Sequence, residues 1–588
     1  MSDRIVRIGG ASGAWGDSPM AIAQLLTEPV DYLIMDYLAE VTMSLLAKAR
    51  LKSAEAGYPP DFVAYLEPHL KTLLDRGIKV VSNAGGVNPM ACKRALEAAA
   101  EKAGISLRVA VVEGDDVMSR IEELRAQDTR EAVSGEPLPA ALLSANAYLG
   151  ALPIVAALKK GADIVITGRC VDSALTLGIL MQEFAWPEDD YDRLAAGSLA
   201  GHLLECGAQV TGGLFTDWET VPDWHNIGYP IAECAADGTF IITKPKNTGG
   251  ILTAASVAEQ VLYEVGDPAN YLLPDVTADF SLLHLKALQN GVRVSGARGH
   301  APTTTYKVSA TYQDGFRAIA LIVIIGIDAA RKADRTAEAL IARSEMLFAE
   351  RGWPGFTATH VEALGAESAY GAGSRARNTR EVVLRLVVDH PSFNALDLFA
   401  RQIGAVGISF AQGTAGLIGG RPKPTPVVRL FTLFVEKSTM PQPTVGSDAP
   451  FSVAIPPGKP LSCSAASTTT LLPTNGPMIE VPLLRVAHAR SGDKGNSSNI
   501  AIFSRKPEYV DHLRAVLTPE RIAEHFKLVA DGPVERFEAP GLHAFNFLIQ
   551  SALGGGGMAS PRIDPQGKAY GQRALEMLVS VPSAWFQS

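Results

Sequence analysis

Acidic and basic side chains stand directly after several apolar runs in the first third of the chain. Asp36 and Glu113 each follow a run typical of a buried strand, and Arg169 follows the run GADIVITG at 161–168. A carboxylate there can move a proton, and an arginine can hold a substrate carboxylate through two hydrogen bonds. We therefore predict catalytic roles for Asp36, Glu113, Arg169 and Asp172, with Asp36 or Glu113 as the general base. An Arg169–Asp172 pair that only closes the turn is the alternative.

The elements that would position these groups are repeated strand–loop–helix units over residues 4–206. Strands that alternate with helices predict a parallel sheet covered on both faces, and the carboxyl ends of its strands share one edge. Polar and glycine-rich loops at these ends add candidates for substrate binding: Ser12, Gly13, Asn83, Gly85, Gly86 and Asn88. Some of these residues are equally loop formers or helix caps, Asn88 foremost.

The segment HLLECGAQVTGG supplies a second group of polar residues after a predicted helix. His202 and Glu205 are three positions apart and share a helix face, so they could transfer protons or bind a metal. A surface pair, or a packed histidine with a partner, is the alternative. Gln209 lies in the turn that follows. No HExxH or other recognised metal spacing is present. We assign the three residues to substrate binding and predict no metal site.

Beyond this region the pattern changes twice. Residues 214–436 predict an α+β domain with a largely antiparallel sheet, including a helix from about Thr248 and a hairpin around Gln313-Asp314-Gly315. Residues 437–478 are rich in Pro, Ser, Thr and Gly and predict a linker. The expected fold class is therefore α/β, with a parallel domain at 1–213 and a small domain after the linker.

That last domain, residues 479–588, has the strand and helix order of a ferredoxin-like α+β sandwich. Its glycine-bearing segment predicts a site for a phosphate or a thioester-bearing ligand. The candidates are His488, Ser491, Asp493, Lys494 and Asn496. The spacing is not that of a P-loop, and a tight hairpin closed by an Asp–Lys pair is the alternative.

Bulk properties narrow the function classes. The net charge is −9 and no basic run is present, so nucleic acid is not an expected partner. The five cysteines are widely spaced, which fits a reducing compartment. The longest apolar run, 318–327, is too short to span a membrane. We expect a cytoplasmic protein without a membrane partner, and a homo-oligomer as the default for a metabolic enzyme.

Four N-terminal motifs together resemble the acyclic terpene utilisation protein A (AtuA) family: RIGGASGAWGDSP, NAGGVNP, GADIVITGRCVDSALTLG and GHLLECGAQVTGG. The tail LLRVAHARSGDKGNSSNIAIFS resembles the AtuA-like ferredoxin-fold domain, here fused to the main body. Similar proteins are encoded beside acyl-CoA dehydrogenases, biotin-dependent carboxylases and enoyl-CoA hydratases of acyclic terpene or branched-acid catabolism. The resemblance implies a pathway and not a mechanism.

Two functions follow as hypotheses. The first is a lyase or hydratase that acts on an acyl-CoA thioester or a related carboxylated intermediate, with CoA as part of the substrate and no further cofactor. The second is a non-catalytic ligand-binding or scaffold protein of the same pathway. A nicotinamide dehydrogenase is a weaker third, because GGASGAWG does not satisfy GxGxxG.

Overall fold

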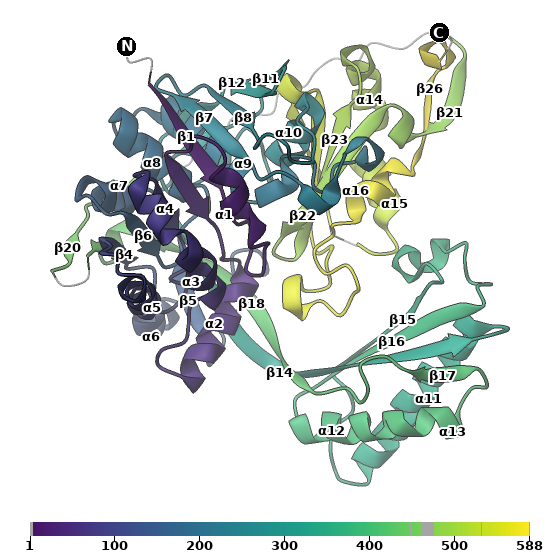
Figure 1. Cartoon of the computed structure of the whole chain (residues 1–588). Helices are drawn as coiled ribbons and strands as arrows, with labels where there is room; N and C mark the ends of the chain where they lie inside the picture. The colour runs from purple at the N-terminus through teal and green to yellow at the C-terminus, as the bar shows by residue number, and fades with distance from the viewer. Residues whose placement is uncertain (1–3, 447–448, 461–475, 531, 587–588) are drawn as a thin grey trace.

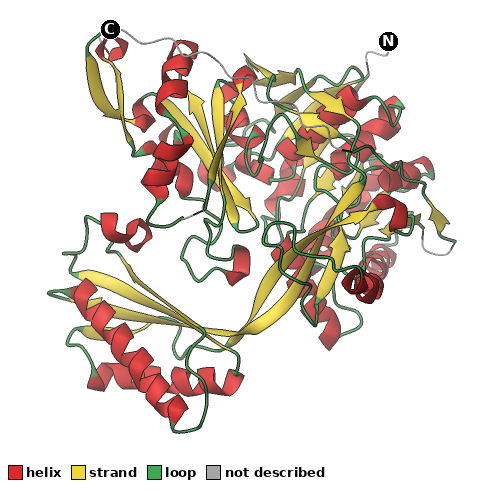
Figure 2. Cartoon of the chain, turned by 180° about the vertical axis from the view of Figure 1, so that it is seen from behind, coloured by secondary structure: helices red, strands yellow, loops and turns green. Residues whose placement is uncertain are grey.

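The computed structural model describes residues 4–446, 449–460, 476–530 and 532–586. Figure 1 shows three parts. The first body holds an eleven-stranded sheet and its helices. The distal body, residues 316–425, lies below it on the far half of one long strand, and the C-terminal domain, residues 478–586, lies beside the first body. Figure 2 shows the same arrangement from behind.

The centre of the large sheet is parallel, as alternating strands and helices predict. Its neighbouring strands are, in order, β1 (Ile5–Gly10), β2 (Tyr32–Met35), β3 (Lys79–Ser82), β6 (Ile164–Thr167) and β4 (Val109–Glu113). Antiparallel strands extend the sheet on both sides. Beyond β1 lie β7 (Ile231–Ala235), β8 (Phe240–Thr243), β12 (Gly291–Ser295) and β11 (His284–Leu288); beyond β4 lie β19 (Thr444–Val445) and β20 (Phe451–Ser452).

Helices cover both faces of the sheet because its strands are apolar on both sides. Along β2, Leu33 and Met35 face one helical layer, and Tyr32 and Ile34 face the other. The first layer contains α1 (Met20–Leu25), α2 (Glu40–Lys52), α3 (Pro60–Leu66), α4 (Leu70–Asp75) and α5 (Pro89–Lys102). The second contains α6 (Ile121–Ala126), α7 (Leu152–Lys159), α8 (Ala174–Phe184), α9 (Tyr191–Leu204) and α10 (Ala254–Val261).

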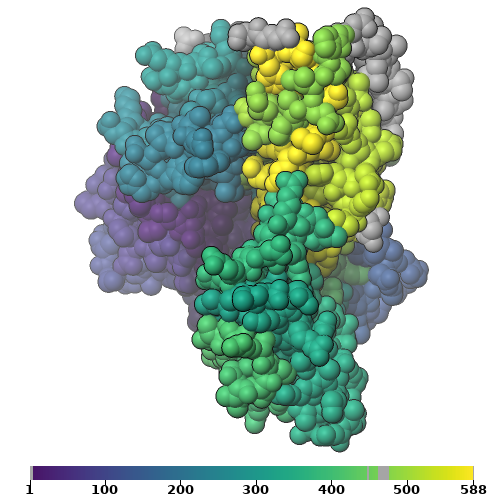
Figure 3. Space-filling view, turned by 90° about the vertical axis from the view of Figure 1, so that its right-hand side faces the viewer, coloured from purple at the N-terminus to yellow at the C-terminus, as the bar shows by residue number. Residues whose placement is uncertain are grey.

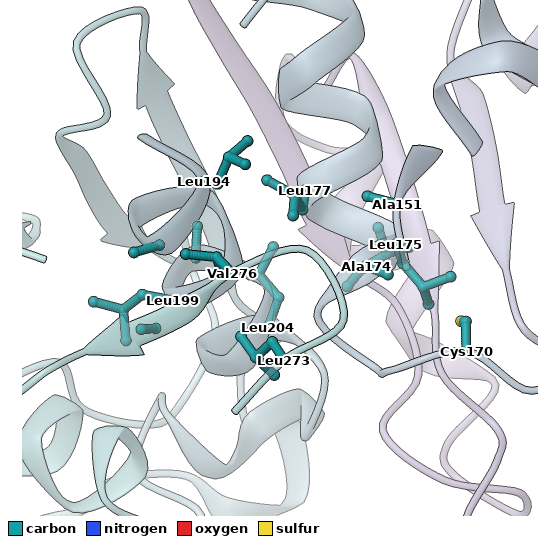
Figure 4. Close-up of a cluster of buried hydrophobic side chains, with 14 of the residues drawn as sticks. Ala151, Cys170, Ala174, Leu175, Leu177, Leu194, Leu199, Leu204, Leu273 and Val276 are labelled. Atoms are coloured by element: carbon teal, nitrogen blue, oxygen red, sulfur yellow. The ribbon is translucent and has the colours of Figure 1, made fainter. Parts of the chain in front are cut away.

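The second layer holds the core next to the sequence motifs. Figure 4 shows Leu175 and Leu177 of α8 and Leu199 and Leu204 of α9 among buried neighbours. Almost every residue of these two helices is buried. They are therefore internal elements, and the segments at their ends are held firmly.

The domain expectations differ from the observed sheets in two places. The first-body sheet continues through β7, β8, β12 and β11, so the boundary expected after residue 213 lies inside one sheet. In the segment expected as a linker, β19 pairs with β4 and β20 pairs with β19. Residues 461–475 of that segment lie outside the described residues. The helix expected from Thr248 begins instead at Ala254, behind a Thr253–Ser256 capping box.

The predicted hairpin around Asp314 is wrong. Residues 305–325 form a single strand, β14 (Thr305–Ile325), and the two halves of β14 pair with different partners. Its first half pairs with β18 (Thr425–Glu436) and β5 (Ser144–Ala147), and its second half pairs with β16 (Glu381–His390) and β17 (Thr414–Leu417). The turn residues produce an irregularity between Gln313 and Phe316, where the register against β18 shifts.

The distal body is an antiparallel sheet with helices on one face (Figures 1 and 2). It contains β15 (Ala358–Leu364), β16, β17 and the second half of β14. Its helices are α11 (Ala329–Ala349), α12 (Phe393–Gln402) and α13 (Val406–Ser409). This part fits the predicted α+β segment with a largely antiparallel sheet.

The C-terminal domain has a four-stranded antiparallel sheet in the order β22 (Ala487–Lys494), β23 (Ser497–Ser504), β25 (Ala544–Ile549) and β24 (Val534–Ala539). Its helices are α14 (Val510–Val516), α15 (Pro519–Phe526) and α16 (Tyr570–Leu575). A further pair, β21 (Met478–Pro482) and β26 (Leu578–Pro582), joins the ends of the domain. Figure 3 shows this domain against the first body, with the distal body below.

The remaining strands form a small sheet beside α9, in the order β13 (Arg298–His300), β10 (Thr277–Asp279) and β9 (Tyr271–Leu272). Among the described residues, no helix combines the length and the apolar character needed to cross a membrane.

Candidate functional site

The turn after β6 places Arg169 at the carboxyl edge of the parallel strands. Gly168 has no room for a side chain, because an added Cβ would lie 2.4 Å from Asp115 Oδ1. The Asp115 carboxylate accepts hydrogen bonds from the Arg169 backbone N–H and from Asn146 Nδ2, both at 2.8 Å. Burial raises the pKa of Asp115 to about 6. Asp115 thus fixes the turn that presents Arg169.

The Arg169 guanidinium is buried among charged and aromatic groups. Its Nη1 donates to Asp172 Oδ1 at 2.6 Å, and its centre lies 4.1 Å from the centroid of the Tyr148 ring. Lys307 Nζ lies 4.6 Å from the same centroid and 3.2 Å from Glu40 Oε1, which also accepts from the Tyr148 hydroxyl. Two cations and two carboxylates therefore surround one tyrosine ring.

Asp36 lies at the end of β2, as predicted. Its Oδ1 accepts hydrogen bonds from Asn83 Nδ2 at 2.5 Å and from the Leu38 N–H at 3.1 Å. Ser12 Oγ donates to the Asp36 carbonyl at 3.0 Å. Asp36 is 6 % exposed, and among these contacts only neutral groups touch its carboxylate. We call Asp36, Glu40, Tyr148, Arg169, Asp172 and Lys307 the edge cluster.

The two aspartates of the edge cluster differ in proton affinity. Burial raises the pKa of Asp36 well above its usual range, and the Asp172 charge raises it further. Burial also raises the pKa of Asp172, but the Arg169 guanidinium opposes this, and the result is about 6. Asp172 therefore ionises first, while Asp36 keeps its proton.

The other charged groups of the edge cluster stay ionised. Burial alone would raise the pKa of Glu40, but Lys307 and Arg169 outweigh burial and hold it below the usual range. Burial alone would lower the pKa of Lys307, but the charges of Tyr148 and Glu40 reverse the shift. The site thus combines fixed charges with one carboxyl that holds a proton.

The C-terminal domain brings its own charged residues to the same place. Lys494 Nζ donates to the Glu264 carbonyl at 3.0 Å, and Lys568 Nζ lies 3.3 Å from Glu264 Oε1 and 3.8 Å from Asp493 Oδ1. Burial raises the pKa of Asp493 to about 6, and the Glu40 charge adds to this.

Lys307 of the first body affects the pKa of Lys494 in the C-terminal domain. Burial lowers the pKa of Lys494, and the Lys307 charge lowers it further. Two parts of the chain therefore share one charged region. The predicted Asp493 and Lys494 belong to this region, and they contact the segment around Glu264 instead of forming the Asp–Lys pair considered from the sequence.

His202 and Glu205 form the pair that their spacing predicts, but they lie inside the protein. His202 Nδ1 is 2.8 Å from Glu205 Oε1, and His202 Nε2 is 3.2 Å from the Val261 carbonyl. The His202 ring thus joins the end of α9 to the end of α10. Gln209 Oε1 accepts a hydrogen bond from Arg490 of the C-terminal domain.

Other predicted binding residues of the C-terminal domain have structural partners. His488 Nδ1 is 2.8 Å from Glu259 Oε1, and its ring stacks on Phe503. Ser491 Oγ donates to the Gly567 carbonyl at 2.7 Å and accepts from the Gly571 N–H. Asn496 Oδ1 accepts from the Gly555 N–H at 2.7 Å. The His488–Glu259 contact joins the two parts, and the contacts of Ser491 and Asn496 lie within the C-terminal domain.

Two amides at the strand ends have different roles. Asn83 holds the edge cluster: it donates to Asp36 and accepts from the Tyr37 N–H at 2.9 Å. Asn88 caps α5, and its Nδ2 donates to the Ala54 and Ala56 carbonyls. The helix-cap alternative for Asn88 therefore matches its contacts, and its binding role stays a prediction.

The three predicted glycines allow close approach of backbone segments. An added Cβ at Gly13 or Gly85 would lie 2.6 Å from the Cys206 carbonyl carbon or 2.5 Å from the Thr167 carbonyl oxygen. Gly86 has φ of +56°, where a side chain would be strained. These loops thus hold the carboxyl edge compact.

Glu113 lies apart from the edge cluster. It pairs with Thr444 where β4 meets β19, and the buried carboxylate beside Arg169 belongs to Asp115. The catalytic role predicted for Glu113 stays a prediction. The contacts of Glu113 do not favour this role.

Several residues of the site were missed from the sequence: Glu40, Asp115, Tyr148, Glu264, Lys307 and Lys568. Asp115 stands only two positions beyond Glu113, the residue for which a catalytic role was predicted. Lys307 lies within a long strand, where no local pattern marks it. Across the described ranges, no group of three or more His, Cys, Asp or Glu residues is arranged to hold a metal ion.

Comparison with known families now adds to this geometry. A model of the acyclic terpene utilisation family protein AtuA matches residues 6–445, and a model of the AtuA ferredoxin-like domain matches residues 481–580. The chain belongs to the AtuA family. The resemblance seen in the motifs and the predicted ferredoxin-like domain are both confirmed. AtuA membership implies a part in acyclic terpene utilisation. No curated protein matches the chain.

Proposed function

We propose that this protein is an enzyme of acyclic terpene or branched-acid degradation. Its substrate is an acyl-CoA thioester or a related carboxylated intermediate, and its reaction is a hydration, a dehydration or a C–C cleavage. The observation that carries the proposal is the Asp36–Asp172 pair beside Arg169. One carboxyl group keeps a proton and the other ionises first, which is the arrangement that acid–base catalysis requires.

The contacts of the two aspartates suggest their roles. Asp172 touches the Arg169 guanidinium at 2.6 Å and serves as the general base. Asp36 is held by neutral donors, stays protonated and serves as the general acid. This assignment replaces the base role first predicted for Asp36 and keeps both residues in the catalytic group.

The same pair serves either reaction type. In a dehydration, Asp172 takes the proton next to the thioester carbonyl, and Asp36 gives its proton to the departing hydroxyl, which leaves as water. In a cleavage, Asp172 takes the proton of the hydroxyl, the C–C bond breaks, and Asp36 protonates the resulting enolate. Lys307 and Lys494 place positive charge where the thioester oxygen becomes negative.

Arg169 supports recognition of a second carboxylate on the substrate. Its guanidinium centre lies 4.1 Å from the centroid of the Tyr148 ring, and a planar guanidinium suits bidentate binding of a carboxylate. No cofactor is needed for these steps, because proton transfer and charge stabilisation suffice.

The test is turnover of purified full-length protein, followed by mass spectrometry. The panel contains geranoyl-CoA and its carboxylated and hydrated derivatives. We expect a mass change of one water or the appearance of two fragments for one substrate, and loss of this activity in Asp172→Asn. Asp75→Asn, on the exposed end of α4, is the matched control. Binding of a CoA ester without turnover would refute the enzyme and favour the ligand-binding alternative.

A further inference from the structure

A cavity of about 450 Å³ lies between the first body and the C-terminal domain. The first body contributes the Gly212–Phe215 turn and two tryptophans, Trp218 and Trp224. The C-terminal domain contributes Arg490 and Lys568. The volume lies within the range of small-molecule sites.

One side of the cavity is aromatic and open to solvent. Trp218 and Trp224 are 55 % and 57 % exposed, and their ring centroids are 5.9 Å apart with an angle of 64° between the planes. Phe215 adds a third ring. Exposed tryptophans beside a cavity offer flat surfaces on which a planar ligand can stack.

The other side carries a buried positive charge, and no described acidic side chain is hydrogen-bonded to it. Arg490 is 7 % exposed and donates to the Leu214 carbonyl and to Gln209 Oε1, which are both neutral. Within the described ranges, Arg490 Nε has no hydrogen-bond partner. A buried donor of this kind is costly unless an acceptor completes it. Nε itself is closed off from the cavity, but each terminal nitrogen of Arg490 carries a second N–H that can donate to an anionic oxygen there.

Lys568 connects the cavity to the charged region of the site. It lines the cavity, and its Nζ lies 3.3 Å from Glu264 Oε1 and 3.8 Å from Asp493 Oδ1. Lys568 therefore borders both the cavity and the charged region that contains Lys494.

We propose that this cavity binds the nucleotide end of a coenzyme A thioester. The adenine stacks on Trp218 and Trp224, and a phosphate oxygen accepts from the terminal N–H groups of Arg490 and from Lys568 Nζ. The choice of coenzyme A rests on the proposed function. The aromatic and cationic halves of the cavity support the nucleotide independently of any reaction.

The test is titration of the full chain with adenosine 3′,5′-bisphosphate, read by tryptophan fluorescence and by calorimetry. We expect saturable binding with quenching of fluorescence. Trp224→Ala should weaken binding at least fivefold, and Arg490→Gln at least tenfold. Arg335→Gln, an exposed arginine on α11, is the matched control and should leave the affinity unchanged. Trp224 is more than half exposed, so its variant keeps the test valid if Arg490→Gln fails to fold.

Any one of the following results would overturn the proposal. The first is no binding of the bisphosphate, and the second is binding that neither cavity variant weakens. The third is equal affinity for inorganic phosphate, or competition by a geranoyl thioester that lacks the nucleotide. Nucleotide binding without turnover of any CoA ester would leave the cavity assignment standing and refute the proposed function. Turnover with a KM that both cavity variants leave unchanged would refute the cavity assignment alone.

Discussion

Two buried arginines at two junctions of the molecule differ in how fully they are paired. Arg317 lies where the distal body meets the C-terminal domain, and its five hydrogen bonds go to both oxygens of Asp389 and to the carbonyls of Met558, Ala559 and Ser560. Arg490 lies where the first body meets the same domain, and it has neutral partners and an unpartnered Nε.

The difference separates a structural contact from a binding surface. A guanidinium whose five N–H groups each donate to a protein acceptor has no capacity left for a ligand. The role of Arg317 is therefore to fix one part of the molecule against another. Around Arg490 and the edge cluster, charges are incompletely matched and carboxyl groups keep protons. Arg490 therefore keeps hydrogen-bonding capacity beside the site where we propose catalysis, and Arg317 keeps none.

Removing a carboxyl group from the unmatched junction should give the largest effect. Asp36→Asn and Asp172→Asn should each lower kcat about 10²–10⁴-fold, the usual contribution of general acid–base catalysis. Substrate affinity, measured by calorimetry, should change far less, because the amide keeps the shape of the site. A loss of affinity equal to the loss of kcat would assign the aspartates to binding only.

Breaking the matched junction should affect stability instead of chemistry. Arg317→Met leaves the Asp389 carboxylate buried without its partner and should lower the free energy of unfolding by about 3–5 kcal/mol. Chemical denaturation measures this value. Arg317→Met combined with Asp389→Leu should recover part of the loss, whereas full additivity of the two changes would show that the pair is not coupled.

The buried carboxyl groups should make stability fall as pH rises. Burial is the largest cause that raises the pKa of Asp115, Asp172 and Asp493 to about 6, so between pH 5 and 6.5 the folded chain binds more protons than the unfolded chain. The raised pKa of Asp115 alone lowers the free energy of unfolding by about 3 kcal/mol at most as the pH rises through this window. Thermal unfolding across this window should show a falling Tm, with a shallower slope in Asp115→Asn. A flat profile would contradict the burial of these groups.

Activity should depend on pH in a bell shape. The base Asp172 ionises near pH 6, and burial lowers the pKa of Lys568 to about 8, so its charge is lost above that value. We expect kcat/KM to fall about tenfold per pH unit below 6 and to decline again above 8. Lys568→Arg should move the alkaline limb upward. An unchanged alkaline limb in that variant would show that another group controls it.

The sequence locates the parts of the site that depend on local pattern. Asp36 and Arg169 follow apolar strands, and the carboxyl ends of parallel strands meet at one edge whatever the rest of the chain does. Asn83 was found for the same reason. His202 and Glu205 were paired correctly by helical spacing, but spacing does not reveal that both are buried.

The rest of the site depends on contacts between distant segments. Lys307 lies beside Tyr148 because β14 pairs with β5, and Lys494 joins the region because two domains dock. The hairpin prediction failed for the same reason, since a turn signal says nothing about which strands lie beside it. The sequence resemblance predicted the family, and the residues that complete the charged region required the structure.

The order of strands in the large sheet also constrains how the protein is made. The strands of this sheet come from residues 5–295 and 444–452, and β19 and β20 are added last, outside β4. The edge at β4 therefore stays open on the ribosome until residue 452 has emerged, which takes roughly 20–90 s at translation rates of about 5–20 residues per second. During that time the half-built sheet exposes apolar strands. Heterologous expression should accordingly benefit from chaperones that bind nascent chains, and a truncation before β19 should aggregate even though it keeps every residue of the N-terminal motifs.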